Sequence, residues 1–245
     1  MPAVASNGMI RSAFIPILLI VLALIPPPAT WADYKDDVGL SQPGMTLPAG
    51  SEIIATQVEA ASDCNWQPNT TIQTEFWEQG TPKTFSYGTC DPECNAACGV
   101  SGHATSVAKY FFGNASSLWN GILSIEVFDA EWWLGDDDLN SANPYPFALP
   151  DVSQSRVANH SWVGNSGYAA EILRRMDWVV EKDEFVQVTA LNNGSTPKQL
   201  PYNMFNAIAA GRTDHIHTPQ TSFVDEVYTA GRVRPHIVVP FNRTS

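Results

Sequence analysis

Four polar side chains in this sequence are of the types that transfer an acyl group through a hydroxyl. In chain order they are a carboxylate, an imidazole, a carboxamide and a hydroxyl, at Glu59, His103, Asn192 and Ser245. A serine hydroxyl becomes a nucleophile when an imidazole takes its proton, and a carboxylate holds that imidazole in the required tautomer. A side-chain amide can stabilise the oxyanion that develops. These residue types predict acyl-transfer chemistry if the fold brings them together.

The elements around these residues are predicted from hydrophobic periodicity. An apolar run in 51–60 predicts a buried strand ending at Glu59, and a helix is predicted to begin at His103 and to stop at Gly113. Further strands are predicted at 124–128, 156–162 and 184–190, with an amphipathic helix over 169–182. The sequence of helix followed by strand is predicted to repeat over 207–210 and 237–239.

This alternation is typical of an α/β fold, a mainly parallel sheet with helices on both faces. Ligands of such sheets bind beyond the carboxyl ends of the strands, where the strand order reverses. Glu59, Asn192 and the residues near Ser161 all follow predicted strands. We therefore expect them to converge on one cleft.

The beginning of the chain predicts export. A short apolar run over 14–25 is followed by three prolines, and Thr30-Trp31-Ala32 supplies small residues for cleavage, so residues 1–32 predict a signal peptide. A retained membrane anchor is the alternative, because positive charge before the apolar run is sparse. Residues 33–50 predict a polar arm or leader, and 51–245 predicts a single domain. We expect a secreted or extracytoplasmic monomer, with no membrane association once the signal is removed.

The net charge and the cysteines limit the classes of partner and of structural site that the sequence allows. The net charge of -12 argues against a nucleic-acid partner, because no basic stripe exists to contact phosphates. All four cysteines lie between Cys64 and Cys98, which in an exported protein predicts two disulfides in a loop region rich in turn residues. Three pairings are open, and a zinc site is the weaker alternative.

Five short blocks, in the same order, resemble those of the subtilase family of serine peptidases. The resemblance covers most of 51–245. SGHATSVA at 101–108 is similar to the family's GHGTHVA, and TALNNG at 189–194 is similar to AAGNxG. The remaining blocks are VANHSWVG at 157–164, NAIAAG at 206–211 and RPHIVVP at 234–240, after which Thr244-Ser245 matches the start of TSxATP. The order acid, histidine, serine is also the subtilisin order.

The resemblance implies a subtilisin-like three-layer sandwich that is incomplete at the C-terminus, and a secreted serine endopeptidase. It assigns His103 as general base, Ser245 as nucleophile and Asn192 as oxyanion-hole donor. Glu59 stands where the family has aspartate, so the triad would be Glu/His/Ser. The substrate would be a peptide or protein. Its binding groove would be lined by Ser161, Trp162 and Gly164.

Other functions remain open from the sequence. The main alternative is an inactive or truncated secreted protein of the same fold that acts as a binding module. Asp129 and Glu131, next to Trp132 and Trp133, would also suit a carbohydrate-active protein. No cofactor is expected to be required. Calcium is a possible ligand of the acidic run 136–140, although an acidic surface loop is the simpler interpretation, and His215 and His217 are interpreted as surface residues.

Overall fold

The computed structural model describes residues 42–44, 46, 50, 52–77, 82–91, 94, 98–135, 149–192, 198–212 and 223–239. Contacts divide the chain into two units, residues 1–46 and 47–245, and every helix and strand among the described residues belongs to the second. The predicted signal peptide lies outside the described residues. Within the described part of the chain, no helix is both long and apolar enough to cross a membrane.

Among the described residues, seven strands form the main sheet, and four helices and two small strand pairs accompany it. The strands of the sheet are β1 (Ile54–Glu59), β3 (Thr84–Tyr87), β5 (Ser124–Asp129), β6 (Val157–His160), β7 (Val186–Ala190), β8 (Ala207–Arg212) and β11 (Ile237–Val239). The helices are α3 (Gln73–Phe76), α4 (Gly102–Phe112), α5 (Ala130–Gly135) and α6 (Ala169–Asp183). The small pairs are β2 (Asn65–Gln67) with β4 (Gly99–Val100), and β9 (Phe223–Val224) with β10 (Val233–Arg234).

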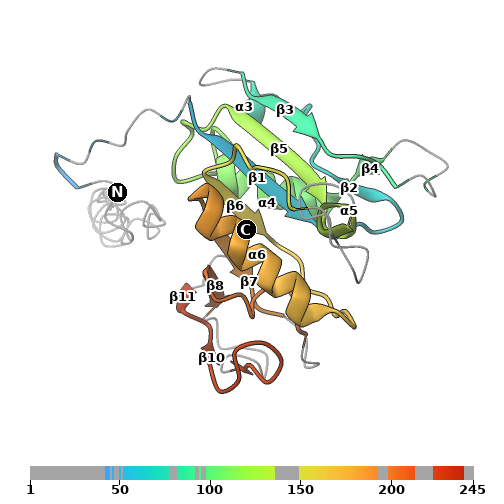
Figure 1. Cartoon of the computed structure of the whole chain (residues 1–245). Coiled ribbons are helices and arrows are strands. Elements are labelled where there is room, and N and C mark those ends of the chain that lie inside the picture. The colour runs from blue at the N-terminus through green and yellow to red at the C-terminus, as the bar shows by residue number, and fades with distance from the viewer. Residues whose placement is uncertain are drawn as a thin grey trace, which may run out of the picture. The chain divides into compact units, whose positions relative to one another are not determined.

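The main sheet is parallel throughout, with the strand order β11-β8-β7-β6-β1-β5-β3 (Figure 1). The predicted α/β fold is therefore confirmed. After β5 the chain crosses to the other side of β1, where β6 pairs with it. The carboxyl end of β1, which carries Glu59, thus lies at the point where the direction of winding changes, the usual place for a ligand crevice in such sheets.

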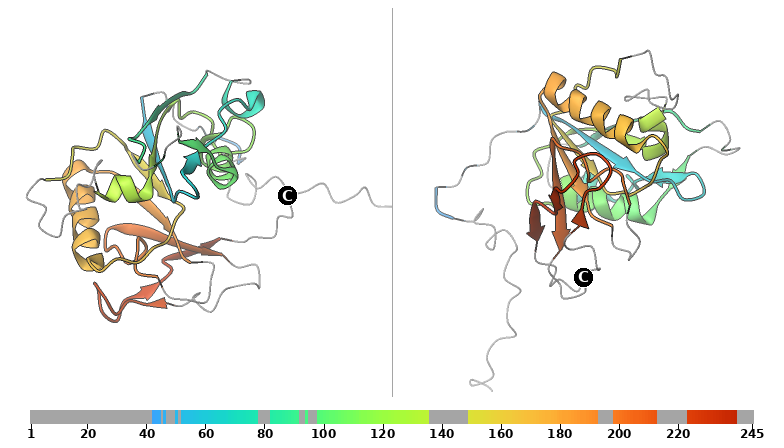
Figure 2. Two further views of the ribbon diagram at one scale, coloured as in Figure 1. Left: turned by 90° about the vertical axis from the view of Figure 1, so that its right-hand side faces the viewer. Right: turned by 60° about the horizontal axis from the view of Figure 1, so that its bottom comes forward.

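Helices cover the two faces of the sheet because successive side chains of each strand point to opposite faces. Val58 and Ala158 pack with Leu173 and Met176 of α6 in one core cluster. Ala55 and Val127 point the other way and pack with Phe112 of α4. Figure 2, left, shows α5 and α6 on one side of the sheet and α4 on the other. On the α4 side the cover is partial, since Val186 of β7 remains 49% exposed.

The α6 sequence explains its position. Its apolar residues recur at spacings of three and four, and this stripe is buried against the sheet, while the charged residues of the helix other than the buried Asp177 lie outside the stripe. Glu184 ends the helix in the left-handed conformation, at φ 55°, and its N–H bonds to the Val180 carbonyl. A left-handed residue at this place reverses the chain and leads it directly into β7.

The cysteine-rich segment differs from the predicted loop region. It contains β2, α3 and β3, and β3 joins the main sheet as an edge strand parallel to β5. Thr84-Phe85-Ser86-Tyr87 alternates polar and aromatic residues, and the Phe85 ring packs edge-on against Phe76 of α3. The two predicted disulfides form as Cys64–Cys94 and Cys90–Cys98, one of the three open pairings.

The repeat of helix and strand predicted over 207–210 and 237–239 is wrong in its first half, because both segments are strands, β8 and β11. Alanine-rich sequence favours a helix locally, but Ala207 and Ala209 are buried in the sheet between β7 and β11. A buried guanidinium secures the loop before β8. Arg234 is fully buried and donates to the carbonyls of Tyr202 and Met204 at 2.9 and 2.8 Å.

Candidate active site

Glu59 is the last residue of β1 and is almost completely buried. Its side chain is 1% exposed and lies on the face of the sheet that α4 covers. The strand forms because Ile54–Glu59 is an apolar run between parallel neighbours on both sides. A carboxylate at the end of such a strand is presented at the edge where the ligand crevice is expected.

His103 is positioned by the first turn of α4. Ser101 is the N-cap residue, and its Oγ accepts a hydrogen bond from the Ala104 amide at 3.3 Å. The Thr105 hydroxyl donates to the Ser101 carbonyl at 2.7 Å and also accepts from the Asn69 amide at 2.8 Å. These contacts fix the beginning of the helix one residue before the predicted start. As a result His103 projects from a rigid turn, with its side chain 64% exposed.

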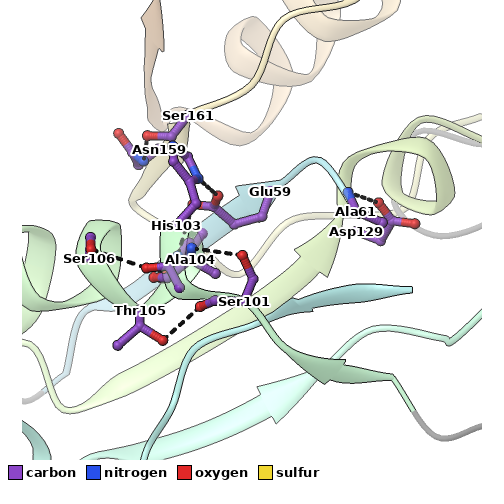
Figure 3. A network of polar contacts seen from close by, with 12 residues as sticks. Glu59, Ala61, Ser101, His103, Ala104, Thr105, Ser106, Asp129, Asn159 and Ser161 are labelled. Carbon is purple, nitrogen blue, oxygen red and sulfur yellow. Dashed lines mark hydrogen bonds and ion pairs between the residues drawn. The ribbon is translucent and has the colours of Figure 1, made fainter. Parts of the chain in front are cut away.

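The structure brings Glu59 and His103 into direct contact. His103 Nδ1 lies 2.7 Å from Glu59 Oε2 (Figure 3). Because a carboxylate only accepts, Nδ1 carries the proton and Nε2 keeps its lone pair. The hydrogen bond that His103 donates to Glu59 raises the pKa of His103 above its ordinary value, partial burial opposes this, and the charge of Glu59 adds to the increase. This is the tautomer and the basicity that a general base requires.

A residue that the sequence analysis did not select supports the carboxylate. Gln57 is fully buried, and its Nε2 donates to Glu59 Oε1 at 2.9 Å and to the Ala104 carbonyl at 2.9 Å. Each oxygen of Glu59 therefore has its own partner. Gln57 lies two residues before Glu59, so both point to the same face of the strand, and this spacing is the sequence signal that could have identified it.

A pocket of about 490 Å³ opens at the same edge of the sheet. Ala60 and Ala61, which follow Glu59 directly, form part of its wall. The remaining wall comes from the β5–α5 junction, the segment after β6, α6 and Leu200. The pocket therefore lies where β5 and β6 separate on the two sides of β1, as expected of a ligand site in this topology.

Of the residues expected to line a substrate, Trp162 and Gly164 border this pocket. Trp162 is 6% exposed, and its indole N–H donates to His160 Nδ1 at 3.1 Å. The N–H and the carbonyl of Gly164 are both paired with Leu200, at 3.0 Å each. A peptide backbone could pair with Gly164 only by displacing Leu200, so in this fold the glycine contributes to the pocket wall.

Ser161 follows β6, whose residue His160 is level with Val58 of β1. Ser161 thus lies beside Glu59 at the carboxyl edge, and its Oγ accepts from Asn159 Nδ2 at 2.8 Å (Figure 3). Asn192 follows β7 by two residues and belongs to the same edge. Ser245 lies outside the described residues, as do the acidic run 136–140 and His215 and His217.

The carboxylates that prompted the carbohydrate hypothesis have other surroundings. Asp129 is 5% exposed, and its Oδ1 accepts from the amides of Ala61 and Glu131 at 3.3 and 3.4 Å. Trp133 is 3% exposed and belongs to the core beside α6, so it offers no platform for a sugar ring. Among the described residues, no three histidines, cysteines or carboxylates are placed to hold a metal ion.

Known proteins resemble this chain in structure but not in sequence. No family model matches the chain, and no curated protein matches it in sequence. One similar solved structure is that of the prenylagaramide maturation protease PagA, with a TM-score of 0.40 and 11% identity over 68% of this chain and 55% of that one. The chain thus spans about half the length of that protease.

Proposed function

We propose that this protein is a secreted serine endopeptidase with a Glu/His/Ser catalytic triad. The contact between Glu59 Oε2 and His103 Nδ1 at 2.7 Å carries the proposal. An exposed imidazole is held by a buried carboxylate at the carboxyl edge of a parallel sheet, and the two residues after that carboxylate line a pocket at the same edge. This arrangement supports a general base near a substrate site.

In this mechanism His103 Nε2 takes the proton of the Ser245 hydroxyl as its oxygen attacks the peptide carbonyl. The imidazolium that forms is stabilised by Glu59, and it then gives its proton to the leaving amine. The oxyanion accepts hydrogen bonds from the Asn192 side-chain amide and the Ser245 backbone N–H. Water then repeats the sequence to release the acyl group, and the serine is restored.

Glutamate is suited to the position of the acid because of where its carboxylate is held. Its two oxygens are divided between Gln57 and His103, so the longer side chain is anchored at one oxygen and orients the imidazole with the other. The requirement for the acid is an acceptor for Nδ1–H, which glutamate also fulfils in some known triads.

The test is hydrolysis of a pool of internally quenched peptides, together with labelling by a fluorophosphonate and mapping of the modified residue by mass spectrometry. We expect His103→Ala and Ser245→Ala each to lower kcat/KM by ~10³-fold or more, and Ser245→Ala to abolish labelling. Ser106→Ala is the matched control, because Ser106 lies on the exposed side of the same helix and bonds only to the Gly102 carbonyl in the described part of the chain.

The outcomes separate the alternatives. No hydrolysis and no labelling by folded protein would favour an inactive protein of the same fold that acts as a binding module. Labelling of Ser161 in place of Ser245 would keep the peptidase but move the nucleophile to the end of β6.

A further inference from the structure

The chemistry of the pocket at the carboxyl edge of the sheet suggests what it binds. Its walls combine apolar groups, including Leu134, Ile172 and the indole of Trp162, with the carboxyl groups of Asp129 and Glu131. A ligand that fills it must present an apolar portion to the first set and a positive charge to the second. The side chains of arginine and lysine have this composition, an aliphatic stem that ends in a cation.

The charge balance of the pocket is one-sided. Among the described residues that line it there is no lysine, arginine or histidine, and in the described part of the chain neither Asp129 nor Glu131 is in an ion pair. Burial raises the pKa of Asp129, the backbone amides that it accepts from oppose this, and the charge of Glu131 raises it further. A cation between the two carboxylates would relieve their repulsion.

The aromatic wall is held in place from behind. His160 is fully buried and accepts the indole N–H of Trp162, while the Trp133 ring packs edge-on against it at 5.1 Å. Trp162 therefore presents a fixed surface to the pocket. An indole positioned in this way can also attract a cation through its ring face.

We propose that this pocket receives a basic side chain, arginine or lysine, of a peptide substrate. This proposal rests on the proposed peptidase function, because it assumes that the peptide that binds is a substrate. The aliphatic stem lies along Trp162 and Ile172, and the cationic head lies between Asp129 and Glu131.

Binding is measured first, without turnover, in a His103→Ala background. N-acetyl-L-argininamide and N-acetyl-L-norleucinamide are titrated separately while the indole N–H resonance of Trp162 is followed by NMR. We expect the arginine compound to bind about tenfold more tightly. Glu131→Gln should weaken it about threefold, as for an exposed ion pair, and Asp129→Asn with Glu131→Gln by a further several-fold. Asparagine can still cap α5, so the double variant keeps the pocket wall.

The matched control is Glu171→Gln, which removes one exposed carboxylate from the first turn of α6 and should leave both affinities unchanged. Cleavage is then compared for quenched peptides that carry arginine or norleucine at each position. Equal binding of the two amides overturns the pocket proposal, even if peptides are cleaved. Carboxylate-dependent binding of the arginine compound without cleavage of any peptide refutes the peptidase function and leaves the pocket as a site for basic side chains.

An independent observation concerns Gln57. This amide joins two elements through one nitrogen, since Nε2 donates both to the carboxylate at the end of β1 and to the Ala104 carbonyl in the first turn of α4. Loss of the donor would free Glu59 Oε1 to rotate and would remove the side-chain bond between β1 and the first turn of α4. We infer that Gln57 is a positioning residue, which holds Glu59 in the orientation that His103 needs.

Gln57→Leu tests this inference through the titration of His103, followed by NMR. Glu59 is the charged residue of β1 that faces His103. Because Gln57 is neutral, its replacement changes no charge, so a change in the titration of His103 reports a change in the position of the Glu59 carboxylate. We expect the midpoint to fall toward the ordinary histidine value and kcat to fall about tenfold with little change in KM. Gln187→Leu is the control, because it also removes a fully buried amide but on β7, bonded to the Met176 carbonyl.

An unchanged His103 midpoint in folded Gln57→Leu overturns the positioning role. A lowered midpoint without peptide hydrolysis in the wild type supports the positioning role and refutes the peptidase function.

Discussion

His160 should make the protein sensitive to acid, although it lies outside the proposed triad. Its ring is fully buried against Trp133 and Trp162, and burial lowers its pKa to about 3. The indole N–H of Trp162 donates to Nδ1, which must therefore be unprotonated in the folded protein. In the unfolded chain the same ring titrates near its ordinary pKa of about 6.5.

The size of the effect follows from these two values. Below pH ~6.5 the unfolded chain binds one proton more at this site than the folded protein does, so the free energy of unfolding falls as the pH falls. The free energy of unfolding then changes by up to about 1.4 kcal/mol per pH unit. Stability is free of this loss only above the pKa that His160 has in the unfolded chain. Between pH 7 and pH 4 His160 alone should lower the stability by about 3 kcal/mol.

The measurement is urea unfolding followed by far-UV circular dichroism at pH 7 and pH 4, for wild type and His160→Asn. Asparagine offers an acceptor to the Trp162 indole but does not titrate, and its smaller volume lowers stability equally at both pH values. The stability difference between the two proteins should therefore shrink by about 3 kcal/mol from pH 7 to pH 4. If both proteins lose the same amount, the buried neutral imidazole is not the cause.

Three further predictions concern other buried polar contacts. Glu59→Gln removes the main cause of the raised pKa of His103, so the acid limb of the pH profile of kcat/KM should move to lower pH while its plateau falls by ~10² or more; an unmoved limb would separate the limb from His103. Glu75→Gln should cost about 1–3 kcal/mol in urea unfolding, because this 4% exposed carboxylate accepts from the amides of Ala115 and Ser116 at 3.2 and 3.1 Å; a loss below ~0.5 kcal/mol would contradict this. Arg234→Met should cost at least about 3 kcal/mol by leaving buried carbonyls unpaired, and a thermal melt no lower than that of the wild type would refute it.

The elements that carry the proposed dyad could be predicted because their signals are local. The apolar run before Glu59 and the helical spacing after His103 each lie within about ten residues, and both elements form where predicted. That these two residues meet, with Nδ1 toward Oε2, depends on α4 packing on the face of β1 that Glu59 occupies. The order of the motifs indicated this meeting, but only the fold gives its geometry.

Other features could not be predicted because they depend on tertiary neighbours. β3 is a four-residue edge strand in a cysteine-rich segment, and it becomes a strand by pairing with β5. β8 is alanine-rich and is a strand only because two parallel neighbours enclose it. The pocket requires β5 and β6 to lie on opposite sides of β1, and the burial of His160 requires α5 and α6 on the same face. No local spacing encodes either arrangement.

The two cysteine bridges lie close to the segment that presents His103. Cys98 immediately precedes β4, and the Ser101 cap of α4 follows two residues after that strand begins. Formation of the disulfides therefore reduces the conformational entropy of the unfolded 64–98 segment. This favours the folded state, in which the first turn of α4 is formed. In a glutathione-rich environment that restraint would be absent. The structure thus couples the preorganisation of the imidazole to the redox potential of the compartment in which the chain folds.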